Sequence, residues 1–121
     1  MQDIAKYLGD TSKVNWQSQG HIEPFAAEKS LLLTMGEGTA GSILASTHYV
    51  WYGKICATMR SSQGRGVVTA FIMMSDVRDE IDFEWVGVDL NNVQSNYYSQ
   101  GVTVCKSSAI CSPPNRTDRV M

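Results

Sequence analysis

Hydrophobic and polar residues alternate most regularly in the segment 79–85, which reads DEIDFEW. Its carboxylates, Glu80, Asp82 and Glu84, are separated by large apolar residues. A period of two residues is that of a β-strand, so the segment is predicted to be a strand with one acidic and one apolar face. We expect the apolar face to lie on the core. The acidic face then holds a row of carboxylates on a rigid support.

The rest of the chain contains several more segments with the length and composition of strands. The apolar run 67–74 does not alternate, which predicts a central strand covered on both faces. Segment 48–60 is predicted as one long half-buried strand with Trp51 in the core, and segment 20–29 as a loop. Short strands separated by turns indicate an all-β sandwich or barrel rather than a βαβ fold. The remaining strands are expected at 13–19, 30–35, 42–47 and 93–100.

Length and charge restrict the classes of function. The chain has 121 residues, enough for one modest domain, and its net charge of −2 provides no basic surface for nucleic acid or for anionic lipid. No apolar run approaches the roughly 20 residues of a membrane span. The first residues, MQDIAK, have no apolar signal-peptide core, so the chain by itself is expected to stay in the cytoplasm.

The cysteines and the end of the chain add little chemistry. Cys56, Cys105 and Cys111 do not have the spacing of metal ligands, and no metal or cofactor is predicted. Cys105 and Cys111 can pair locally and leave Cys56 free; the alternative is three unpaired thiols. The segment 102–121 lacks periodicity and contains a Pro-Pro pair, so it is predicted to be a disordered tail.

A second polar row follows the acidic strand. Gln94, Asn96 and Tyr98 also alternate with a period of two, and the turn at 87–92 suits a hairpin. A register that pairs residue 84 with 94 would place all six side chains on one face, whereas a slip of one residue would turn one row away. Amide and phenol groups beside carboxylates are hydrogen-bond partners for sugar hydroxyls. The predicted pairs are 84 with 94, 82 with 96, and 80 with 98.

Three carboxylates on one face suit glycoside cleavage. A retaining glycosidase needs one carboxylate as nucleophile and one carboxyl group as acid/base. Crowding of the three groups keeps one carboxyl protonated near neutral pH. Alternation alone leaves two other interpretations open, namely a solvated outer face and a calcium site built from carboxylate oxygens.

The residue string narrows these alternatives. Segment 79–85 resembles the E-x-D-x-E motif of glycoside hydrolase family 16. The segments ASTHYVWYGK (45–54), GVVTAFI (66–72), SDVR (75–78) and QSNYY (94–98) are similar to the fungal Crh-type branch of that family, which joins chitin to β-glucan in the cell wall. The resemblance covers about residues 3–101.

The resemblance implies a β-jelly-roll of two antiparallel sheets and an extracellular, cell-wall location. It implies that Glu80 is the nucleophile, Asp82 the assisting carboxylate and Glu84 the general acid/base. Gln94, Asn96 and Tyr98 would bind substrate on the donor side. Chitin and β-glucan are the implied partners, with no cofactor, no nucleic acid and no membrane span.

Length is the main departure from the family. Family domains are about twice as long, so residues 1–101 are expected to be the N-terminal half of a catalytic domain and 102–121 a divergent tail. Two alternatives to an active transglycosylase therefore stay open: a truncated, inactive fragment and a non-catalytic carbohydrate-binding sandwich.

Overall fold

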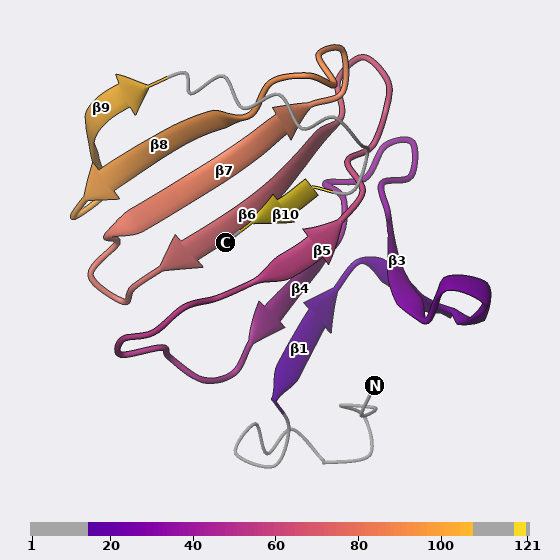
Figure 1. Cartoon of the computed structure of the whole chain (residues 1–121), viewed down its shortest axis with the longest axis horizontal. Helices are drawn as coiled ribbons and strands as arrows, with labels where there is room; N and C mark the ends of the chain where they lie inside the picture. The colour runs from indigo at the N-terminus through magenta and orange to yellow at the C-terminus, as the bar shows by residue number, and fades with distance from the viewer. Residues whose placement is uncertain (1–14, 108–117, 121) are drawn as a thin grey trace. The chain divides into compact units, whose positions relative to one another are not determined.

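The structure is a computed structural model that describes residues 15–107 and 118–120. These residues form β-strands joined by turns, and every strand pair is antiparallel (Figure 1). The prediction of an all-β fold is therefore confirmed. The chain divides after Trp51 into two compact units, which are described separately below.

The N-terminal unit contains two strand pairs. Strand β1 (Trp16–Gln19) pairs with β4 (Ile43–Ser46), and β2 (His21–Phe25) pairs with β3 (Ser30–Thr34) across a short 3-10 helix, η3 (Ala26–Glu28). Strand β2 corrects the prediction of a loop at 20–29. Its Pro24 is tolerated because β2 pairs only with β3 in the described part of the chain, which leaves one edge without ladder bonds to lose.

A serine hydroxyl joins these two pairs. The Ser42 Oγ atom accepts a hydrogen bond from His21 N–H at 2.8 Å and lies 2.6 Å from the Thr34 carbonyl oxygen, to which it donates. The start of β2 and the end of β3 are therefore tied to the residue that precedes β4.

The C-terminal unit contains a four-stranded meander. Its strands are β6 (Val68–Met74), β7 (Glu80–Val86), β8 (Gln94–Ser99) and β9 (Val102–Ser107), in that order across the sheet (Figure 1). Consecutive strands are neighbours, so only short turns are needed to build the sheet. The unit also contains β5 (Ala57–Met59), which pairs with β10 (Asp118–Val120).

Two strand predictions and the predicted tail are corrected in this region. Strand β6 stands first in its sheet, and its residues alternate between exposed and half-buried instead of being covered on both faces. Only Ala57–Met59 of the predicted strand 48–60 is a strand, and Trp51 is 93% exposed rather than in the core. The prediction of a disordered tail at 102–121 is wrong for residues 102–107, which form β9 beside β8, and for residues 118–120, which form β10; the rest of the predicted tail lies outside the described residues. Cys56 is free, whereas Cys111 and the side chain of Cys105 lie outside the described residues.

The two turns at one end of the meander are bonded to each other. Asp79, which ends the β6–β7 turn, accepts a hydrogen bond from Gln100 N–H at 2.9 Å through its Oδ1 atom. The Gly101 N–H donates to the Arg78 carbonyl oxygen at 2.8 Å. Both Arg78 and Gln100 adopt left-handed backbone conformations, with φ of 65° and 50°. The start of β7 is therefore fixed to the β8–β9 turn.

The turn between β7 and β8 is held by one aspartate. The Asp89 carboxylate accepts from Asn91 N–H at 3.2 Å and from the Asn92 side-chain amide at 2.7 Å. These bonds, led by the one from the Asn92 side chain, lower the pKa of Asp89. Because the turn sets the hairpin register, this carboxylate fixes which residue of β8 faces which residue of β7.

Replacing Asp89 with alanine is expected to destabilise the hairpin near neutral pH. A lowered pKa in the folded state stabilises the fold above the unfolded-state value and loses this effect as pH falls through the folded-state pKa. The difference in melting temperature between wild type and Asp89→Ala should therefore be largest at neutral pH and shrink below about pH 3.8. Thermal melts monitored by circular dichroism would measure it, and a constant difference from pH 7 to pH 2 would contradict the role of the charge.

The best-packed region of the described chain is the far end of β7. Trp85 is 7% exposed and Val93 is 9% exposed. Segment 62–64 lies against this end, because Gly64 N–H donates to the Gly87 carbonyl oxygen at 3.0 Å and Ser62 N–H donates to Thr69 Oγ1 at 3.0 Å. Thr69 is the register partner of Trp85, so this segment lies on the indole side of the sheet.

Candidate active site

The acidic strand and the strand that follows it have the predicted register. Strands β7 and β8 pair antiparallel, and the polar rows of both strands therefore share one face of the sheet. A shift of one residue would have separated them. The pairs are Glu80 with Tyr98, Asp82 with Asn96, and Glu84 with Gln94.

Strand β6 contributes a third row to the same face, which the sequence analysis did not identify. Ala70, Ile72 and Met74 are the register partners of the three carboxylates on the side away from β8. All three are exposed. The carboxylates therefore lie between a row of amide and phenol groups and a row of apolar side chains. The length of the turn at 75–79 was the available signal, because an odd number of turn residues pairs even-numbered residues of β6 with the even-numbered carboxylates of β7.

Asp82 is the centre of this face and is only 5% exposed. It has Glu80 and Glu84 two positions away along the strand, and Ile72 and Asn96 across it. Neighbours on all four sides bury the shorter side chain of Asp82, while the longer glutamates stay half-buried.

Two buried oxygen atoms at this centre have no partner. Asp82 Oδ1 and Asn96 Oδ1 are buried acceptors without a hydrogen-bond donor among the described residues. A buried acceptor without a donor costs about 1–3 kcal/mol.

Glu80 is the carboxyl group of this row whose pKa is raised. Burial is the largest cause that raises the pKa of Glu80, followed by its hydrogen bond to Asp82 and by the negative charges of Asp82 and Glu84. Glu80 and Asp82 thus share a hydrogen bond between carboxyl groups.

Replacing Asp82 with asparagine is expected to lower the pKa of Glu80. The change removes one neighbouring charge, and an amide N–H would then favour the ionised form of Glu80. Burial and Glu84 remain, so the pKa should stay above the ordinary value of 4.5. Carbon-13 NMR of the glutamate side-chain carboxyls would follow the titration, and an unchanged Glu80 midpoint would contradict the assigned coupling.

The same shift has a consequence for stability. A carboxyl whose pKa is raised by folding stabilises the fold fully below the unfolded-state value and loses that effect as pH rises through the folded-state pKa. Wild type should therefore lose stability above about pH 4.5, relative to a Glu80→Gln variant that cannot titrate.

No group of three His, Cys, Asp or Glu side chains in residues 15–103 is arranged to hold a metal ion. Nor does any helix in the described part of the chain have the length and apolarity needed to cross a membrane. The β6–β8 face offers carboxyl groups, which can act as nucleophile or proton donor, and side chains that can hydrogen-bond hydroxyl groups.

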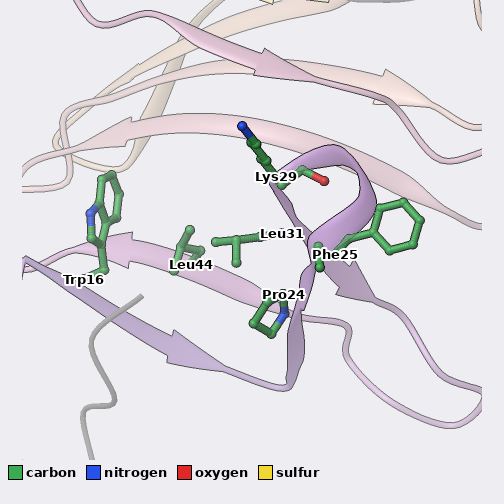
Figure 2. A pocket seen from close by; sticks show the side chains of 8 residues that line it. Trp16, Pro24, Phe25, Lys29, Leu31 and Leu44 are labelled. Atoms are coloured by element: carbon green, nitrogen blue, oxygen red, sulfur yellow. The ribbon is translucent and has the colours of Figure 1, made fainter.

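A separate hollow lies in the N-terminal unit. It has a volume of about 470 Å³ and is bordered mainly by apolar side chains, among them Trp16, Leu31 and Leu44 (Figure 2). No lining residue is acidic, and Lys29 is the one charged residue among them. The hollow thus has no carboxyl group for glycoside cleavage, and the candidate active site is the β6–β8 face.

Comparisons with known proteins identify the family of the chain. The family model "Glycosyl hydrolases family 16" matches residues 10–118. The chain is 56% identical to Crh-like protein 2 of Aspergillus fumigatus over 80% of its length and 21% of the relative's. It is 50% identical to Crh-like protein UTR2 of Candida albicans, and 48% identical to the "Probable glycosidase CRR1" of Saccharomyces cerevisiae.

Coverage of these relatives is partial. The UTR2 match spans 79% of this chain and 20% of the relative, and the CRR1 match spans 68% and 19%. The chain thus spans about a fifth of the length of the curated relatives it matches. No solved structure matches it. The family match covers most of the chain, including β6, β7 and β8, and the chain therefore belongs to glycosyl hydrolase family 16, among its Crh-like members.

Proposed function

We propose that this chain carries the catalytic strand of a retaining β-glycan transglycosylase of the fungal cell wall, with chitin as donor and β-glucan as acceptor. One observation carries the proposal: three carboxylates share a face of β7 in register with Gln94, Asn96 and Tyr98 of β8. Family membership supports a polysaccharide substrate. The Crh-type resemblance of segments 45–54 and 66–72 supports the choice of chitin and β-glucan and the cell-wall location.

Glu80 acts as the nucleophile in this proposal. It attacks the anomeric carbon of the donor sugar while Glu84 gives its proton to the departing sugar oxygen. The bond between the two sugars breaks, and a glycosyl ester forms on Glu80. Asp82 supports this step because its carboxylate, which is hydrogen-bonded to Glu80, can accept the proton that Glu80 must lose before it attacks.

The second step regenerates the enzyme. Glu84, now ionised, removes the proton from an acceptor hydroxyl, whose oxygen attacks the anomeric carbon of the ester. The bond to Glu80 breaks and its carboxylate is restored. Gln94, Asn96 and Tyr98 would hold the donor sugar through its hydroxyl groups during both steps, because they lie on the same face beside the carboxylates.

One assay tests the function. The protein is incubated with chitin oligomers and a fluorescently labelled β-glucan acceptor, and labelled hybrid products are separated by chromatography. Hybrid or shortened products in wild type support a catalytic function. Equal binding of chitin oligomers by wild type and Glu80→Gln with no product from either would favour a non-catalytic carbohydrate-binding sheet. Absence of both binding and product would indicate that the chain by itself is an inactive fragment.

A further inference from the structure

We infer that the apolar row on β6, formed by Ala70, Ile72 and Met74, is the acceptor-binding site. By binding the acceptor sugar there, the row makes the glycosyl-enzyme react with sugar in preference to water. This inference rests on the proposed function and names residues that determine its outcome. It begins from the register, which places Ala70 opposite Glu84, Ile72 opposite Asp82 and Met74 opposite Glu80. Directly opposed side chains have Cβ atoms about 4.5–5.5 Å apart.

The two sides of the carboxylate row differ in chemistry. On the β8 side, Gln94, Asn96 and Tyr98 all carry hydrogen-bonding groups. On the β6 side, Ile72 is 48% exposed and Met74 is 56% exposed, so apolar surface lies open beside the reacting carboxylates. A donor sugar held by its hydroxyls fits the polar side. The apolar side is left for the second sugar.

A sugar ring can use such a surface, whereas water cannot. The C–H groups of a β-linked glucose ring form flat apolar faces, and their removal from water against Ile72 and Met74 is favourable. The Ile72 and Met74 side chains themselves offer water no hydrogen bond, so they favour a sugar ring over water at this position. The small Ala70 leaves room beside Glu84, where the attacking hydroxyl must give up its proton.

Both second steps have the same atomic balance. In transfer, the acceptor oxygen bonds to the anomeric carbon, the ester bond to Glu80 breaks, and the acceptor proton moves to Glu84. In hydrolysis, a water oxygen replaces the acceptor oxygen. The apolar row therefore acts through the relative occupancy of sugar and water at one position, and the chemistry itself is unchanged.

Two polar substitutions test the assignment. Met74→Gln keeps the length of the side chain and Ile72→Thr keeps its branching, and both sites are exposed enough to accept the change in a strand. Each variant should lower the ratio of transfer to hydrolysis, by up to roughly tenfold. Met74→Leu keeps the apolar surface and should restore the ratio. Met73→Gln is the matched control, because Met73 faces the opposite side of the same strand, opposite Ile81.

A second readout does not require turnover. In methyl-labelled wild type, the Ile72 and Met74 methyl resonances should shift when a β-glucan oligosaccharide is added, and the Met73 methyl should not. If wild type does not cleave the donor, the proposed function is overturned, but selective methyl shifts would still support the acceptor-binding site. An unchanged ratio of transfer to hydrolysis in Met74→Gln and Ile72→Thr, or the absence of a selective methyl shift, would overturn the acceptor-binding site itself.

Discussion

Glu80→Gln is expected to abolish transfer and hydrolysis together, by about three orders of magnitude or more. An amide cannot form the glycosyl ester, so both outcomes of the second step disappear at once. The amide N–H can still donate to Asp82, which preserves the hydrogen bond that Glu80 makes when protonated. The loss should therefore reflect chemistry rather than unfolding. Initial rates with chitin oligomers and labelled β-glucan measure both products in one experiment.

The control for this variant is Glu37→Gln, an identical change at an exposed turn residue of the N-terminal unit. It should leave both rates at the wild-type level. Mass spectrometry of the quenched reaction should detect a sugar adduct on wild type and none on Glu80→Gln. Residual activity of Glu80→Gln within about tenfold of wild type would show that another group is the nucleophile.

Gly87→Ala is expected to cause the largest loss of stability among single substitutions near the site. A Cβ atom at residue 87 would lie 2.4 Å from the Gly64 carbonyl oxygen and 3.1 Å from that of Ser62. Backbone atoms cannot move away as a flexible side chain can, so segment 62–64 must leave the end of β7. The hydrogen bond from Gly64 N–H to the Gly87 carbonyl oxygen would be lost as well.

We expect the free energy of unfolding to fall by about 3 kcal/mol, as for an overpacked site. The melting temperature should decrease by roughly 10 °C or more. Gly36→Ala is the matched control, because the nearest atom to its added Cβ would be Thr39 Cγ2, at an ordinary contact distance of 3.6 Å. A melting temperature of Gly87→Ala equal to that of Gly36→Ala would show that segment 62–64 does not pack against β7.

The strand register of the candidate site could be predicted because two independent signals agree. Alternation gave the faces of β7 and β8, and the turn at 87–92 gave the pairing of Glu84 with Gln94. The roles of Glu80, Asp82 and Glu84 in catalysis remain predictions. The burial of Asp82 and its hydrogen bond to Glu80 depend on side-chain packing across strands, which no sequence period encodes.

The strand predictions that are wrong have a common physical origin. β-forming residues indicate that a segment can be a strand, but they do not identify a partner strand. Segment 48–60 alternates well, yet most of it does not pair, and its Trp51 lies exposed. The apolar run in β6 was assigned to a central position, whereas β6 is the first strand of its sheet and exposes Ile72 and Met74.

The order of strands in the meander has a consequence for how the site forms during folding. Strands β6 to β9 pair with their neighbours in sequence, so each contact closes a loop of only a few residues. Loop-closure entropy is therefore low, and local pairing can proceed hairpin by hairpin. By contrast, β5 must find β10 across much of the C-terminal unit. The row of carboxylates can thus reach its partner side chains by short-range contacts, independently of the long-range pairs.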